Sequence, residues 1–256
     1  MPHISYSELK NWDFCPFYHK LTYVDKIKIF EGNVYTAFGT ALHETCEKLA
    51  LDNNSNYESV FKNSFENEVK KLKEIPEDHK TLLSEMKTQG PELASIVLYA
   101  LNTKFPGYRV VSSEEQIMTP IDDLDIDYNF KGFLDLVIKT PDGKYHIIDW
   151  KSCSWGWDIE KKTDKITTYQ LTYYKNFFCK KHNISPTMVE TYFGLLKRTA
   201  KKNRVEIFKI TSGQKKVENA LDFTKKAVYN IHKQLYFKNR MNCTYCEFKH
   251  TKHCPR

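Results

Sequence analysis

Two carboxylates and a lysine occupy neighbouring strands of a β-hairpin predicted over residues 131–151. Asp135 lies in the first apolar run, and Asp149 and Lys151 lie in the second. The intervening segment 141–143, Pro-Asp-Gly, is typical of a three-residue hairpin loop, because proline fits the first corner of a type I turn and glycine fits the left-handed position that follows. Counting outward from that loop places Asp135 directly opposite Asp149.

Both faces of this hairpin are mostly apolar, so its strands are predicted to be central and buried. Alternation of side chains places Asp135, Asp149 and Lys151 on one face, and Leu134 and Leu136 on the other. Directly opposed side chains have Cβ atoms about 4.5–5.5 Å apart, where like charges repel. Two carboxylates on such an apolar face must share a proton or bind a cation. With Lys151 beside them, a divalent metal ion is the favoured interpretation.

A second candidate metal centre lies in the C-terminal tail, which holds Cys243, Cys246 and Cys254. The C-x2-C spacing of the first two places their thiolates around one tight turn, within reach of a single soft-metal centre. A fourth ligand must then come from elsewhere in the chain, or from His250 or His253.

The pattern along the rest of the chain predicts a mixed α/β architecture. Ser5 and Glu8 have the spacing of a helix capping box, and Pro16 ends the helix that follows. Residues 51–105 are predicted to form a helical layer or insertion, with breaks at 75–76 and 90–91. The other expected helices are 4–14, 39–50, 158–182 and 214–238, and the other expected strands are 108–119, 187–197 and 204–210.

Composition places this chain among ordinary globular proteins. It has 256 residues, of which 41% are hydrophobic and 28% charged, enough for one large domain. The formal net charge of +7 mildly favours a polyanionic partner, although simple lysine excess explains it almost as well. We expect no membrane span and no secretory signal. Seven cysteines, unevenly spread, do not suggest a secreted disulfide framework, so we expect a reducing, cytoplasmic setting.

Six separated pieces together resemble the PD-(D/E)XK nuclease superfamily, in particular its RecB-like branch and the CRISPR-associated iron–sulfur exonucleases. Each piece is weak alone, but their common order is specific. The resemblance covers residues 1–50 and 108–256 and leaves 51–105 unmatched. The pieces are Ser5-Tyr6-Ser7-x-Leu9 with Cys15-Pro16, Gly39-x-x-x-His43, Gly132-x-x-Asp135, Asp149-Trp150-Lys151, Gln170-Leu171-x-x-Tyr174 and the cysteine tail.

The resemblance implies a single restriction-endonuclease-like domain over residues 1–256, with a mixed central sheet flanked by helices and a helical lobe. Asp135 and Asp149 would bind Mg²⁺ or Mn²⁺ through their oxygens. The backbone carbonyl of Trp150 and a nitrogen of His43 would complete the set, the nitrogen shifting preference towards Mn²⁺.

The same resemblance implies roles for residues around the metal. Lys151 would orient the attacking water or neutralise charge that develops on the phosphorane. Gln170 and Tyr174 would position Lys151 or the DNA strand. Glu115 would be a further metal ligand or a support for one.

The resemblance also implies a 4Fe-4S cluster held by Cys15, Cys243, Cys246 and Cys254, which would tie residues 5–20 to the tail 240–256. Seven residues separate Cys246 from Cys254, more than the family pattern leads us to expect. Zinc is therefore the alternative metal, bound by four cysteines or by three cysteines and a histidine. Ordinary packing accounts for the remaining cysteines, Cys46, Cys153 and Cys179.

The leading functional hypothesis is a metal-dependent nuclease, an exonuclease acting on single-stranded DNA. One rival is a non-catalytic DNA-binding accessory of a recombination or CRISPR-adaptation complex. Such a protein would be expected to have lost a carboxylate or the lysine, whereas this chain keeps Asp135, Asp149 and Lys151. The other rival is a zinc-stapled interaction module, in which the carboxylates form a structural ion pair with Lys151.

Overall fold

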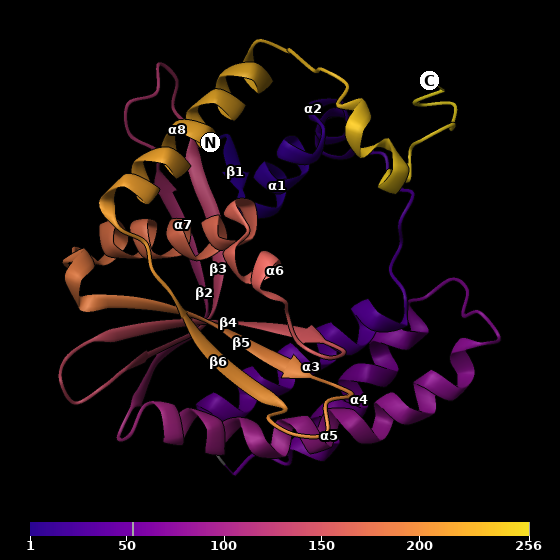
Figure 1. The fold of residues 1–256 in the computed structure, drawn as a ribbon, viewed down its shortest axis with the longest axis vertical. Helices are drawn as coiled ribbons and strands as arrows, with labels where there is room; N and C mark the ends of the chain where they lie inside the picture. Colours follow the sequence, from indigo (N-terminus) through magenta and orange to yellow (C-terminus); the bar gives the residue numbers. More distant parts are fainter. Residues whose placement is uncertain (53, 256) are drawn as a thin grey trace.

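A computed structural model describes residues 1–52 and 54–255, and its centre is a six-stranded mixed β-sheet with helices on both faces (Figure 1). The predicted restriction-endonuclease-like α/β fold is confirmed. The strand order is β1-β3-β4-β5-β6, and β2 pairs with β3. The strands are β1 His3–Ser5, β2 Arg109–Pro120, β3 Asn129–Lys139, β4 Tyr145–Cys153, β5 Val189–Lys197 and β6 Val205–Ile210.

Two helical layers bury the sheet. On one face α3 (Val34–Leu51), α4 (Tyr57–Lys70) and α5 (His79–Lys104) pack over one apolar cluster. On the other face α1 (Tyr6–Phe14), α7 (Lys165–His182) and α8 (Gln214–His232) pack over a second cluster (Figure 1). The shorter elements are α2 Pro16–His19, the π-helical turn Lys20–Val24, α6 Ile159–Thr163 and the 3₁₀ turns Pro186–Met188 and Arg240–Tyr245. No helix in the described residues is long and apolar enough to cross a bilayer.

Two strands pair with the edge of β3 that faces away from β2. β1 pairs in parallel with residues 129–131, and β4 pairs antiparallel with residues 136–139. Residues 132–135 therefore lie where these two neighbours of β3 part. Asp135 is at this point, so the sheet itself opens a gap beside one of the two predicted carboxylates.

The hairpin register agrees with the sequence prediction. The Thr140 N–H donates to the Lys144 carbonyl over 3.0 Å, and Gly143 takes the left-handed φ of +86°. The β3–β4 ladder runs from there to Leu136, which is paired with Ile148. Beyond this pair the backbone ladder stops. The Trp150 N–H donates instead to the side-chain carboxylate of Asp135.

The predicted alternation fails at Leu134, which was expected on the same face as Leu136. Leu134 packs instead with Val137 and Ile147, in the cluster beneath α7. On the neighbouring strand β2, Glu114 lies between the partners of Leu134 and Leu136 and has a left-handed φ of +49°. A backbone in that conformation interrupts the regular pleat of a strand pair.

Helix boundaries differ from the predictions for identifiable reasons. α3 begins at Val34 rather than Gly39, because Asn33 forms a capping box with Thr36. The expected helix 158–182 is two helices, since Asp164 ends α6 and caps α7 through the Thr167 N–H.

The break predicted at 90–91 is absent, and α5 runs through Pro91. Glycine at position 90 allows α5 to pack closely against Phe61, because a Cβ there would lie 2.1 Å from the Phe61 ring. The break at 75–76 is confirmed, since α4 ends at Lys70 and α5 starts at His79.

At the chain start, Ser5 caps α1 by accepting from the Glu8 N–H, as its spacing predicted. Glu8 does not return the contact, because its carboxylate binds the buried His19 at 2.8 Å. The strand β1, which precedes this cap, was not predicted. At the other end, α8 stops at His232 rather than 238.

Candidate functional site

Asp149 is held by neighbours from two elements. Only 1% of the residue is exposed. Gln170 of α7 donates its amide to Oδ1 over 2.7 Å, and Lys151 Nζ lies 2.7 Å from Oδ2. The Gln170 amide also donates to the hydroxyl of Tyr174, one turn further along α7, over 3.1 Å. Four of the predicted site residues therefore form one connected group.

Asp135 is held from the opposite helical layer. Its Oδ2 accepts from the Trp150 N–H over 2.7 Å and lies 3.5 Å from His43 Nδ1 on α3. The His43 ring also forms a hydrogen bond with the backbone of Trp150. The gap in the sheet thus lets α3 reach one carboxylate while α7 reaches the other.

Burial dominates the electrostatics of this site. It raises the pKa of Asp135 and of Asp149 from 3.8 to about 6 in each case, against the lowering effect of Lys151. The pKa of Lys151 is also raised, because the attraction of Asp149 and Asp135 outweighs its own burial. Burial lowers the pKa of His43, which favours its neutral, ligating form.

The donor chemistry of the site fits a hard divalent cation. Two buried carboxylates, a neutral imidazole and a backbone carbonyl supply oxygen and nitrogen ligands. In the described part of the chain, no group of three or more His, Cys, Asp or Glu side chains is positioned to hold a metal ion. The ammonium of Lys151 and the N–H of Trp150 each occupy one carboxylate oxygen that a cation would use.

Glu115 forms its contacts outside the carboxylate site, whereas the side chain of its neighbour Glu114 faces that site. Glu115 is ion-paired with Lys181 and His182 near the end of α7. Glu114 forms a hydrogen bond with Glu47 of α3, and burial together with Glu114 raises the pKa of Glu47 to about 8. Sequence reasoning missed this carboxyl pair. The only available signal was the position of Glu47, one helical turn after His43.

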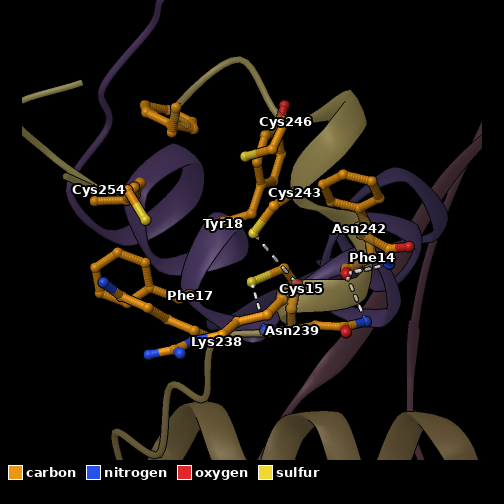
Figure 2. A pocket seen from close by; sticks show the side chains of 13 residues that line it. Phe14, Cys15, Phe17, Tyr18, Lys238, Asn239, Asn242, Cys243, Cys246 and Cys254 are labelled. Carbon is orange, nitrogen blue, oxygen red and sulfur yellow. Dashed lines mark hydrogen bonds between the residues drawn. The ribbon is translucent and has the colours of Figure 1, made fainter. Parts of the chain in front are cut away.

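The four cysteines assigned to a cluster line a single pocket between the two ends of the chain (Figure 2). Cys15 lies between α1 and α2, and Cys243 lies in the 3₁₀ turn that opens the tail. Cys246 and Cys254 follow in the tail, and all seven cysteines of the chain are free thiols.

Backbone N–H groups point at two of these sulfur atoms. The Asn239 N–H donates to Cys15 Sγ over 3.2 Å (Figure 2). The N–H groups of Phe248 and Lys249 donate to Cys246. The bonds to Cys246 lower the pKa of its thiol, but burial outweighs them and raises that pKa above its usual value.

The tail is fastened to the first helices by contacts independent of these sulfurs. The Phe17 N–H donates to the Phe237 carbonyl over 3.0 Å, and the side-chain amides of Asn239 and Asn242 both donate to the Phe14 carbonyl. The Tyr18 hydroxyl donates to Glu247 over 2.9 Å.

The donor set of this pocket fits a soft metal centre. Its described lining includes the four cysteines and neither His250 nor His253, which favours four sulfur ligands over three sulfurs and a histidine. As for the carboxylate site, the described side chains are not arranged to hold a metal ion as they stand.

Comparisons with known proteins bear on the fold and the family. In a solved structure of a candidate exonuclease from Eubacterium rectale, the match covers 96% of this chain and 86% of that one, with 12% identity and a TM-score of 0.59. The solved structure of SSO0001 matches over 94% of this chain and 91% of its own, with 14% identity and a TM-score of 0.40. No curated protein matches this chain.

The PD-(D/E)XK nuclease superfamily matches residues 3–253, nearly the whole sequence. The matched region contains the hairpin carboxylates, Lys151, His43 and the α7 pair Gln170 and Tyr174. Nucleases of this superfamily generally use divalent metals such as Mg²⁺ or Mn²⁺. The chain belongs to the PD-(D/E)XK nuclease superfamily.

Proposed function

We propose that this protein is a metal-dependent deoxyribonuclease that hydrolyses phosphodiester bonds as an exonuclease on single-stranded DNA. The observation that carries the proposal is the group formed by Asp135, Asp149 and Lys151 at the gap in the sheet, supported by Gln170 and His43 from opposite helical layers. The resemblance to the RecB-like branch supports the exonuclease assignment, and the structural neighbour described as a candidate exonuclease has the same fold.

In this proposal Asp135, Asp149, the Trp150 carbonyl and His43 hold the cation. A divalent cation bound there supplies an activated water and polarises the phosphate. Gln170 would fix the orientation of the Asp149 carboxylate through its bond to Oδ1, while Lys151 lies at Oδ2 of the same carboxylate.

Lys151 stabilises charge in the transition state rather than accepting a proton. Its pKa is raised, so its ammonium stays protonated at neutral pH and can face the oxygens of the phosphorane. The Tyr174 hydroxyl restrains Gln170, and thereby acts on the reaction only through the position of Asp149.

We also propose that Cys15, Cys243, Cys246 and Cys254 bind a 4Fe-4S cluster with a structural role, with zinc on the same four sulfurs as the alternative. Support comes from their shared pocket and from the N–H groups that face Cys15 and Cys246. Protein purified without oxygen should be brown and contain iron and sulfide in equal amounts. Colourless protein with one zinc per chain would exclude the cluster and leave the nuclease assignment intact.

The test of the enzymatic proposal uses end-labelled linear and closed circular single-stranded DNA. We expect the wild-type protein with Mn²⁺ or Mg²⁺ to degrade linear strands and spare circles, and Lys151→Ala to lose this activity. Cleavage of circles would identify an endonuclease. A folded, metal-loaded protein that binds DNA and cuts neither substrate would instead support the accessory DNA-binding role.

A further inference from the structure

A phenylalanine is exposed on the central strand β3, beside one of the two proposed metal-binding carboxylates. Phe133 belongs to the segment 132–135, where β1 and β4, the two neighbours on one edge of β3, part. Phe133 is 43% exposed, whereas Gly132 and Leu134 on either side of it are buried. A single exposed apolar side chain is ordinary on a protein surface, so exposure alone assigns no role to this ring.

The alternation of side chains places Phe133 on the same face of β3 as Asp135. A Cβ on Gly132 would lie 3.0 Å from a tyrosine ring of α7, and Leu134 packs in the apolar cluster beneath the same helix. Phe133 and Asp135 therefore point to the opposite face, where His43 of α3 lies 3.5 Å from the Asp135 carboxylate. Two residues of a strand span about 7 Å, so the ring adjoins the proposed metal site.

A lysine and a methionine complete the exposed surface around this ring. Lys131 Nζ lies 5.9 Å from the centre of the Phe133 ring, and Lys131 forms no ion pair in the described part of the chain. Met118 of β2 is paired with Lys131 across the sheet and is 42% exposed. The face of β3 that leads to Asp135 therefore carries, in order, a cation, an aromatic ring and a carboxylate.

An exposed aromatic ring with a cation beside it matches the two parts of a nucleotide. Proteins bind single-stranded nucleic acids by stacking bases on aromatic rings while cations follow the phosphate backbone, and such stacking tolerates any base. We propose that Phe133 stacks against the base of a nucleotide adjoining the scissile phosphate, and that Lys131 contacts a backbone phosphate next to that base. This inference rests on the proposed nuclease function and specifies how its substrate strand is held.

The stacking contact also favours single strands over duplexes. A base in a duplex is already stacked between its neighbours and paired with its partner, and both interactions are lost when it turns out towards a protein ring. A single strand offers its bases at a smaller cost. Phe133 is therefore a residue that determines specificity as well as position.

The test measures affinity for a labelled single-stranded oligonucleotide by fluorescence anisotropy, without added divalent metal so that the strand stays intact. We expect Phe133→Ala to weaken binding by about 5- to 150-fold, the range that corresponds to the loss of one base–aromatic stack. Phe133→Leu, which keeps apolar bulk without the ring, should show a similar loss, and Phe133→Tyr should bind like the wild type. Binding to a duplex of the same sequence should change little.

An abasic strand of the same length separates the two contacts, because it keeps the phosphates and lacks the bases. On this strand Phe133→Ala should bind as tightly as the wild type. Lys131→Gln should instead weaken binding to both strands, and should make the slope of log K against log salt shallower by about 0.7, the contribution of one phosphate contact on single strands. Lys131→Arg should keep the wild-type slope.

Two side chains away from the gap in the sheet serve as matched controls. Lys139, at the other end of β3, lies 4.6 Å from the centre of the Tyr145 ring, the same kind of cation–ring pair. Tyr99 is a 75% exposed aromatic residue on α5. Lys139→Gln and Tyr99→Ala should bind both strands like the wild type, and circular dichroism should show every variant folded.

The outcomes distinguish this inference from the proposed function. If Phe133→Ala binds intact single strands as tightly as Tyr99→Ala does, the inference is wrong even where the wild type cuts DNA. An equal loss by Phe133→Ala on intact and abasic strands would also overturn it, because the ring would then act without a base. If the wild type neither binds nor cuts DNA, the proposed function itself fails.

Discussion

The carboxylate site and the cysteine pocket are built in opposite ways. Asp135 and Asp149 lie on central strands between two apolar clusters, and protein groups contact each carboxylate. The cysteines lie on short helices and turns from the two chain ends, joined by a few hydrogen bonds to Phe14 and Phe17. The first region needs no ion to keep its shape, whereas the second has few buried side chains to do so. A metal is therefore expected to serve chemistry in the first region and folding in the second.

Loss of the carboxylate site should give the largest effect and affect activity alone. We expect Asp149→Asn to lower the cleavage rate by at least about 10³-fold, because it removes an anionic metal ligand and the partner of Lys151. Circular dichroism and the thermal midpoint should change little, since the asparagine can still accept from Gln170. Unfolding of this variant would instead favour a structural role for the ion pair, as the interaction-module hypothesis requires.

Loss of the cysteine pocket should affect structure first. We expect Cys246→Ser, or removal of the metal by a chelator, to expose residues 233–255 to proteolysis while β3, β4 and β5 keep their protection from hydrogen exchange. Limited proteolysis with mass spectrometry measures this directly. Cys179→Ser is the control, because Cys179 is a buried thiol of α7 outside the pocket. Uniform loss of protection across the sheet would show that the two regions are not separable.

The stability of the carboxylate site should depend on pH. The pKa values of Asp135 and Asp149 are about 6 in the folded protein, above the value of 3.8 expected when unfolded. The metal-free folded state therefore binds more protons between pH 4 and 6, and its stability should fall as pH rises through that window, by at most about 3 kcal/mol per carboxyl group.

Affinity for Mn²⁺ should show the opposite trend, rising as pH increases to about 6 and then levelling, because the cation displaces those protons. Calorimetric titrations at pH 5, 6 and 7.5 test this prediction. Asp135→Asn should reduce the pH dependence of stability by roughly half. A metal affinity that stays constant across this range would mean that the cation binds elsewhere.

The smallest expected effect concerns the support of Asp149. Tyr174→Phe removes the hydroxyl that accepts from Gln170 and leaves the ring in place. We expect a loss of activity of about 3- to 10-fold, equivalent to about 0.7–1.4 kcal/mol, because the Gln170–Asp149 bond remains. Gln170→Ala should cost more than Tyr174→Phe. The reverse order would indicate that Tyr174 contacts substrate directly.

Sequence reasoning succeeded where a local pattern determines the geometry. The Pro-Asp-Gly loop sets the hairpin register, and that register places Asp135 and Asp149 on facing strands. The order of six short pieces indicated the family to which the chain belongs.

It failed where tertiary contacts override local preference. Gly90 and Pro91 read as a helix break, but the close approach of Phe61 at Gly90 and burial along α5 keep the helix continuous. The left-handed backbone of Glu114 and the displaced face of Leu134 have no sequence signal, and neither has the position of Glu114 rather than Glu115 beside the site.

The measurement that tests this account most directly is Mn²⁺ binding, followed by the loss of the free-ion signal in electron paramagnetic resonance. We predict that the wild type and Cys246→Ser bind Mn²⁺ at the carboxylate site alike, and that Asp149→Asn abolishes this binding while remaining folded. Undiminished Mn²⁺ binding by Asp149→Asn would contradict the assignment of Asp135 and Asp149 as the metal site of this nuclease family member.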